Sequence, residues 1–451
     1  MENTQISRRK VVAGAAWAAP VVAASAAVPA FAASSTCTDL NTQGTATNNS
    51  TMSSNASAEE TVTMTKDTDF VFTLVGGAGG GSSSSYIGGA GASVTGTLHL
   101  SKGDVVRIVT ASGGVSFTDP GQGNGSGKAT LANASGATEG GRGYGNGGDN
   151  ADLSTVSLPS VIGNSDNLSA IYFYQAYPIA TPRYGGTGGG ASAIYVNDVL
   201  KAVAGGGGGA GAMWTANLAK PADSSVPYFS TTIKERSRGG DAGTDGATAS
   251  SNAKLIAKNE TTQAELASTY ALVTGGSSAS GSTAGAGGTA TSAVGGARTT
   301  ANFKNYQNVD ADGVAGSGAN GGGGSYGYAY GFQATNGSKN PTNSGLEGSS
   351  DSDWQGAVVY TPGTGGGGYA GGGSGAAIGL AYTTGDSTTR TYNGKTVTNY
   401  YGAIGAAVSG GGAGSSFTAD DVDDVTIKSS GVNNTTAQTR VNGSASYSYC
   451  S

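Results

Sequence analysis

The sequence is poor in the residue types that build most catalytic and nucleic-acid-binding sites. Charged residues make up 12% of the 451 residues, against about 25% in an average globular domain. His99 is the only histidine, and no GxSxG, HExxH or phosphate-loop motif is present. Alternation over 97–100 places His99 on the exposed face of a strand. The formal net charge of −6 argues against nucleic acid and anionic membranes as partners. We therefore expect a protein without catalytic activity.

Long apolar runs are also missing, except near the N-terminus. There, Arg8 and Arg9 precede a weakly apolar, alanine-rich stretch and a small-residue cleavage site at Ala32 and Ala33. This order is typical of a cleavable secretory leader, and the paired arginines resemble twin-arginine signals, which export folded proteins in bacteria. A membrane anchor and the general secretory route are the alternatives. We expect the export machinery to remove residues 1–32, leaving a secreted or cell-surface protein without a membrane span.

Cysteine is nearly absent. Cys37 follows the expected cleavage site, and Cys450 lies at the other end of the sequence. In an exported protein such a pair favours a disulfide, which would hold the two ends of the mature chain side by side. Two unrelated thiols are the alternative.

Proline is scarce, with 10 residues, whereas glycine accounts for 82. Collagen requires glycine at every third position and abundant proline, and calcium-binding nonapeptide rolls require a repeated GGxGxD; neither pattern is present. The remaining ordered interpretation is a bundle of polyglycine helices of the polyproline II type. These helices have three residues per turn and bond to each other rather than internally. A flexible linker is the alternative for any single tract.

Short segments of alternating β-branched and aromatic residues separate the tracts. Segments 70–75 and 105–109 are typical of strands. The best helix candidate is 254–273. We expect an irregular Ser/Thr/Asn-rich segment at 33–59 and a glycine-rich β domain at 60–451, all-β with little helix.

Four segments together carry a family resemblance: 76–81, 88–100, 191–209 and 411–417. Their combination resembles the glycine-rich domain of the anaplastic and leukocyte lymphoma-type receptor kinases and of related bacterial and phage surface proteins. The resemblance implies a jelly-roll-like β-sandwich whose long glycine insertions form polyglycine helices. It also implies binding or adhesion rather than catalysis. No kinase segment is present, so receptor signalling is not implied.

Carboxylates supply the only candidates for metal binding and hydrolysis. Asn308, Asp310 and Asp312 have the spacing of the first half of a calcium loop, but Ala319 stands where the closing glutamate belongs. A simple turn is the alternative, and calcium is the only cofactor that the sequence suggests. The densest acidic cluster, 420–424, precedes a strand-like segment. A glycosidase needs two carboxylates, although a solvated loop is the simpler interpretation.

Tyrosine beside glycine recurs along the chain, and Tyr326, Tyr328 and Tyr330 present three rings at a spacing of two. Flat amphipathic rings stack on sugars or fill protein pockets. We therefore expect a secreted or cell-surface structural or adhesive protein that self-associates. The first alternative is a module that binds cell-wall or surface glycans or proteins through Tyr-rich loops. The second is a carboxylate-based hydrolase.

Overall fold

The computed structural model describes residues 40–451, except for 82–85, 117–137, 152–183, 212–213, 218–226, 233–237, 250–252, 260–264, 294–303, 310, 334–353 and 393–394. Within these residues all regular structure is strand, and every strand pair is antiparallel. The all-β prediction is confirmed. The helix candidate at 254–273 is wrong, because the described part of that segment forms two paired strands.

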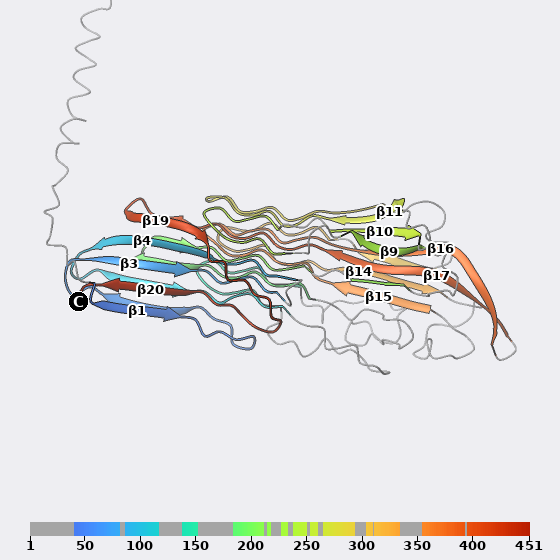
Figure 1. The fold of residues 1–451 in the computed structure, drawn as a ribbon, viewed down its shortest axis with the longest axis horizontal. Helices are drawn as coiled ribbons and strands as arrows, with labels where there is room; N and C mark the ends of the chain where they lie inside the picture. The colour runs from blue at the N-terminus through green and yellow to red at the C-terminus, as the bar shows by residue number, and fades with distance from the viewer. Residues whose placement is uncertain are drawn as a thin grey trace, which may run out of the picture.

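Two five-stranded sheets form one end of the molecule (Figure 1). The first sheet contains, in spatial order, β1 (Thr42–Thr47), β20 (Ser444–Tyr449), β3 (Thr68–Val75), β4 (Ala92–Leu100) and β19 (Val422–Ser429). The second contains β18 (Phe417–Thr418), β7 (Val199–Ala204), β6 (Ser192–Val196), β5 (Val105–Thr110) and β2 (Ala58–Thr63). The strands predicted at 70–75 and 105–109 are β3 and β5. The segment 33–59 is not irregular throughout, because it contains β1.

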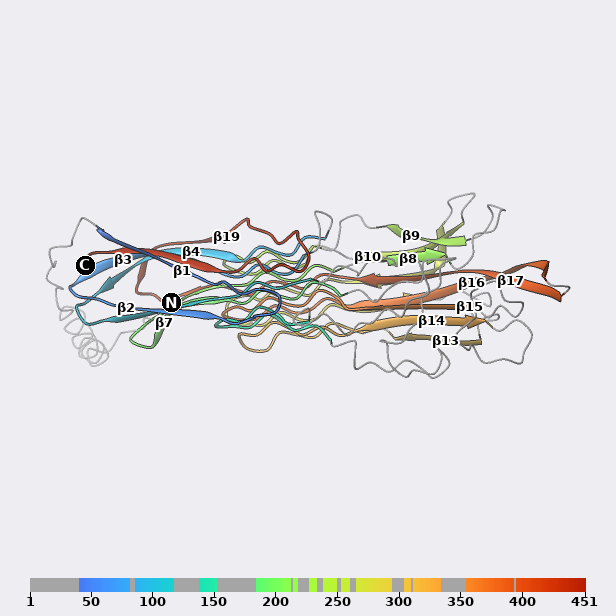
Figure 2. The same cartoon turned by 90° about the horizontal axis from the view of Figure 1, so that it is seen from below.

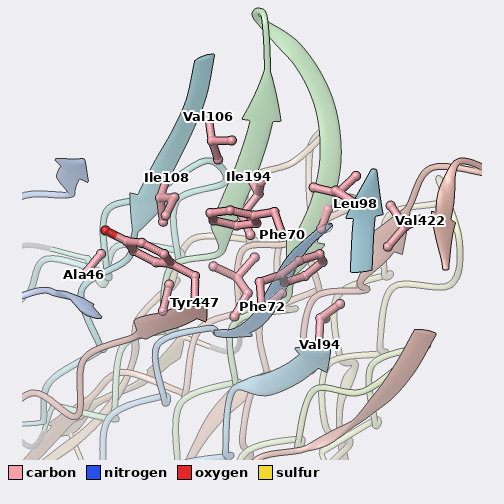
Figure 3. Close-up of a cluster of buried hydrophobic side chains, with 14 of the residues drawn as sticks. Ala46, Phe70, Phe72, Val94, Leu98, Val106, Ile108, Ile194, Val422 and Tyr447 are labelled. Atoms are coloured by element: carbon pink, nitrogen blue, oxygen red, sulfur yellow. The ribbon is translucent and has the colours of Figure 1, made fainter. Parts of the chain in front are cut away.

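A single hydrophobic core lies between these two sheets (Figure 3). In β3, Phe70, Phe72 and Leu74 are fully buried, whereas the residues between them are partly exposed, as expected for a strand with one inward face. Ile108 and Ile194 of the second sheet belong to the same core. Burying side chains of this size contributes about 1.5–3 kcal/mol each. We call the two sheets and their core the sandwich.

Three smaller sheets lie at the opposite end of the elongated molecule (Figure 2). The first consists of β12 (Ala290–Ala293), β11 (Glu265–Val273), β10 (Ala253–Asn259) and β9 (Pro227–Thr232). The second consists of β13 (Lys304–Val309), β14 (Gly327–Gln333) and β15 (Trp354–Tyr360). The third consists of β16 (Ala377–Tyr392), β17 (Lys395–Val408) and β8 (Trp214–Asn217). We call these three sheets the distal sheets.

Candidate functional site: a lattice of glycine tracts

Glycine tracts fill the space between the sandwich and the distal sheets. β3 leads into tract 76–81, β7 leads into tract 205–210, and tract 409–416 joins β17 to β18. Both views show the tracts running side by side along the long axis of the molecule (Figures 1 and 2). The tracts therefore connect two groups of sheets that have no strand in common.

The backbone N–H groups of tract 205–210 donate hydrogen bonds with a repeat of three residues. Gly206 and Gly209 donate to one neighbouring tract, and Gly207 and Ala210 donate to another, whereas Gly205 donates to the Ser416 hydroxyl at 3.1 Å. The donors are Gly206 and Gly209 to tract 361–368 (2.7 and 2.9 Å), Gly207 and Ala210 to tract 76–81 (3.0 and 3.0 Å), and Gly208 to Gly240 (2.9 Å). Between Gly206 and Ala210, successive N–H groups therefore donate to different neighbours, and the neighbour repeats after three residues.

The carbonyl groups of the same tract accept from three further segments, again with a repeat of three. The acceptors are Gly206 and Gly209 from tract 409–416 (3.0 and 2.9 Å), Gly207 and Ala210 from tract 184–191 (2.8 and 2.7 Å), and Gly205 and Gly208 from tract 88–92 (2.8 and 2.8 Å). Tract 205–210 thus has six hydrogen-bonded neighbours. Tract 361–368 also bonds to six segments, and we call the whole arrangement the glycine lattice.

Neighbouring tracts approach so closely that most positions accept no side chain. A Cβ atom added at Gly208 would overlap the carbonyl oxygen of Gly411, and one added at Gly366 would overlap that of Gly206. The obstacle is backbone in both cases, so no change of rotamer relieves it. Close backbone approach therefore explains why glycine occupies these positions.

Hydroxyl side chains take the place of backbone acceptors at several lattice positions. Each of four fully buried hydroxyls accepts a backbone N–H from another tract or segment. They are Thr187 from Val115 (2.8 Å), Thr364 from Gly188 (2.7 Å), Ser409 from Ala376 (2.9 Å) and Ser415 from Ala370 (3.0 Å). Because these groups satisfy N–H groups in the interior, they fix which tracts lie next to each other.

Aromatic rings join the lattice to the outer face of the second sandwich sheet. Tyr369 stacks on Phe417 with ring centroids 4.3 Å apart, and Tyr144 lies 6.5 Å from Tyr195. Burial raises the pKa of the Tyr144 hydroxyl, because the phenolate would be poorly solvated there. Tyr144 and Tyr369, which both lie beside glycine, therefore pack against the protein's own second sandwich sheet.

His99 lies on the outer face of the first sheet, as its alternation predicts, with 61% of its side chain exposed. Its Nδ1 lies 2.6 Å from Asp69 of β3 and its Nε2 lies 2.9 Å from Asp423 of β19. The hydrogen bonds to Asp69 and then Asp423 raise the pKa of His99, because the imidazolium is the form that donates from both nitrogens. The arrangement ties three neighbouring strands together.

The acidic cluster at 420–424 forms an exposed turn and the start of β19. Asp421 pairs with Lys201 of β7, while Asp423 pairs with His99. Two of the four carboxylates thus hold β19 against its neighbours, in keeping with the simpler of the two sequence interpretations.

The calcium candidates are only partly within the described residues. The Asp312 carboxylate accepts the Ala290 N–H at 2.8 Å, so it caps a backbone group. Asp310 and the side chain of Asn308 lie outside the described part. Among the described residues, no group of three or more His, Cys, Asp or Glu residues is arranged to hold a metal ion.

The three tyrosines of the expected binding patch lie at the distal end. Tyr326 is half-buried and precedes β14, and Tyr328 and Tyr330 occupy β14, the central strand of its sheet. The side chains of Tyr328 and Tyr330 lie outside the described part, so the patch stays a prediction.

Sequence reasoning missed Arg440. Its guanidinium donates to the carbonyl oxygens of Thr51 at 2.9 Å and Gly113 at 2.6 Å, and also to that of Glu139. Burial lowers its pKa to about 10, because the charged form is desolvated. Arg440 therefore joins three segments that are distant in sequence, at Thr51, Gly113 and Glu139. The only sequence signal for this role was that Arg440 stands alone in a segment without other charged residues.

Cys450 is fully buried, and the described part contains no free thiol. Its N–H donates to Thr68 at 2.9 Å, next to the pairing of Thr42 with Tyr449. The segments that follow Cys37 and precede Cys450 therefore lie side by side. Cys37, Arg8, Arg9, Ala32 and Ala33 lie outside the described residues, and the disulfide and the leader stay predictions.

Within the residues that the structure describes, none belongs to a helix with the length and hydrophobicity of a membrane span. Neither a protein-family model nor a curated protein sequence matches the chain.

Proposed function

We propose that this is an exported structural and adhesive protein, in which the glycine lattice is a stiff spacer between the sandwich and the distal sheets. The observation that carries the proposal is the hydrogen-bonded repeat of three residues in tract 205–210, with six neighbouring segments. Backbone bonds in several directions resist bending better than a single chain does. The distal sheets are then presented at a fixed distance from the sandwich.

The lattice supports the further proposal that the tracts are polyglycine II-type helices. Their three-residue repeat and the exclusion of Cβ atoms are the properties that this conformation requires. The same features support the resemblance to the glycine-rich domain of surface proteins, including its jelly-roll-like sandwich. That resemblance favours binding or adhesion at the distal end.

The described side chains favour a non-catalytic role. His99 is the only imidazole, and carboxylates occupy both of its ring nitrogens, so neither nitrogen is available to take a proton from a substrate. Asp421 is paired with Lys201. The sequence suggests three functions: a structural or adhesive protein, a module that binds glycans or proteins, and a carboxylate-based hydrolase. The hydrolase is therefore the least supported of the three.

Cell binding tests the adhesive role directly. Purified chain starting at residue 33, fluorescently labelled, is mixed with bacterial cells, with purified cell-wall material and with isolated glycans. We expect retention on cells or wall material, and no turnover in a parallel screen on polysaccharides and peptidoglycan. Absence of retention would contradict adhesion, and turnover would contradict the non-catalytic role.

A second candidate function, glycan or protein binding through the Tyr-rich strand, is favoured by the location of β14 at the distal end. The variant Tyr326→Ser/Tyr328→Ser/Tyr330→Ser should lose most of the retention if these rings contact the ligand. Val199→Ser is the matched control, because it removes an exposed apolar side chain (57% exposed) at the sandwich end. Equal retention by both variants would exclude the tyrosines as the contact.

A further inference from the structure

The sandwich has four edge strands, and three of them carry features that prevent pairing with another chain. Unpaired N–H and C=O groups on an edge strand are a template for a further strand. Natural edges are blocked by charge, by bulges or by short length. The four edges are β1 and β19 in the first sheet and β18 and β2 in the second.

β19 is blocked in two ways. Its register with β4 shifts between Asp423 and Thr426, and Asp424 has a positive φ of 51°, so the strand is bulged. Asp423 and Asp424 are both exposed, and exposed charges on an edge strand disfavour pairing with a further strand.

The two edges of the second sheet are blocked as well. β18 has two residues, and beside it Lys201 pairs with Asp421. β2 contains the adjacent carboxylates Glu59 and Glu60, so it would repel its own copy.

β1 has none of these features. Its sequence, TQGTAT, contains no charge and no proline, and its six residues pair with β20 in unbroken register from Thr42 to Thr47. Among the described strands, β20 is the only one that pairs with it. Gln43, Thr45 and Thr47 are exposed on one face.

Few residues of the mature chain precede this edge strand. If the leader is removed after Ala32, seven residues precede Leu40. The Ser451 N–H donates to Asn41 at 3.1 Å, so the chain enters β1 at the Cys450 end. The expected Cys37–Cys450 disulfide would hold the preceding residues at that end rather than alongside β1.

We propose that β1 pairs antiparallel with β1 of a second copy of this chain, which joins the two first sheets into one continuous sheet. A two-fold axis perpendicular to the joined sheet, next to Thr45, keeps the exposed residues of both copies on one face. Thr45 then lies opposite Thr45 of the second copy, and Gln43 lies opposite Thr47 of the second copy. All of these side chains are neutral and compatible with each other. The inference gives a structural basis to the self-association expected from the sequence, and it rests on the export and removal of the leader in the proposed function.

One strand pair is at the small end of interface sizes, so the dimer should form at micromolar rather than nanomolar protein concentration. Sedimentation velocity on purified chain starting at residue 33 measures this without any cell-surface ligand. Failure of cell binding and failure of dimerisation are therefore distinguishable.

A charge exchange tests the interface itself. The variant Gln43→Lys/Thr45→Lys/Thr47→Lys places lysines opposite lysines, and its dimer dissociation constant should rise at least about tenfold. The corresponding triple glutamate variant should behave in the same way. An equimolar mixture of the two should recover a dimer.

The control is Thr61→Lys/Thr63→Lys, which adds lysines to the exposed face of β2. It should leave the dimer unchanged. Circular dichroism on each variant establishes that it is folded. A wild-type chain that stays monomeric at high concentration, or a triple lysine variant that still dimerises, would overturn the proposal.

Discussion

Backbone N–H and C=O groups are hydrogen-bonded in both the sandwich and the glycine lattice. Side chains fill the space between the sheets of the sandwich, whereas they are excluded from most positions of the lattice. In the sandwich, Phe70 and Phe72 fill the space between sheets, and hydrogen bonds lie within each sheet. In the lattice, tract 205–210 bonds to six neighbours, and a Cβ at most of its positions would overlap another backbone. The sandwich is therefore sensitive to loss of atoms and the lattice to their addition.

The largest effect is expected from adding one methyl group to the lattice. Gly208→Ala would push the new Cβ against the Gly411 carbonyl. We expect the loss in unfolding free energy, measured by chemical denaturation, to exceed the about 3–5 kcal/mol of a large core truncation. Gly243→Ala is the control, because its Cβ meets only Asp245 O at 3.4 Å. Equal stability of the two variants would contradict the sensitivity of the lattice to added atoms.

Truncation of the sandwich core is next. Phe72→Ala should cost about 3–5 kcal/mol, because a fully buried ring leaves a cavity. Val71→Ala, at a side chain that is 38% exposed, should change the unfolding free energy by less than about 0.5 kcal/mol. A small cost for Phe72→Ala would mean that the lattice, not the core, dominates stability.

The expected disulfide should matter somewhat less. Replacing Cys37 and Cys450 by serine should lower the unfolding free energy by about 2–4 kcal/mol, because the unfolded chain is no longer constrained. The measurement compares the double variant with wild type under oxidising conditions. Detection of two unmodified thiols in the oxidised protein by mass spectrometry would contradict the pairing.

Hydroxyls in the lattice should act through hydrogen bonds rather than burial. Thr364→Val keeps the shape of the side chain but leaves the Gly188 N–H and the Gly148 carbonyl without this partner. We expect a cost of about 1–3 kcal/mol in denaturation experiments. Thr364→Ser retains the hydroxyl and should recover part of the loss. If serine and valine are equally destabilising, the hydrogen bonds are not the cause.

The smallest effect is expected at His99. Its pKa is raised in the folded protein, so its contribution is fully present below the unfolded pKa of about 6.5 and is lost as pH rises through the folded pKa. Because the cluster is exposed, the contribution should stay below about 1 kcal/mol. The difference in stability between wild type and His99→Gln should therefore shrink from acidic to alkaline pH. An increase over that range would contradict the assignment.

Local patterns predicted the sandwich strands but not their partners. The alternation at 70–75 and 105–109 is set by one inward face, so a short window is enough to detect it. β1 lacks that alternation and is held by β20, about 400 residues later in the sequence. In 254–273 the same short apolar runs suit a helix or a strand, and antiparallel pairing decides the outcome.

The lattice was predictable as a type but not in detail. Glycine abundance without proline or a strict repeat indicates backbone packing. Identical glycines, however, carry no side-chain information about which tract lies next to which. Part of that information resides in buried hydroxyls such as Thr187 and Thr364, which look like ordinary loop residues in the sequence. The exposure of His99 was foreseeable. Of its two carboxylate partners, Asp69 comes from the preceding strand, whereas Asp423 comes from a strand far away in the sequence.

The glycine tracts should be hydrogen-bonded to each other in solution. Amide hydrogen exchange, followed by mass spectrometry, tests it most directly on peptides covering 205–210, 361–368 and 409–416. We expect slow exchange in these peptides, comparable to that of β3 and β4 in the sandwich. Complete exchange of the tract amides at the earliest time point, while β3 and β4 stay protected, would contradict it.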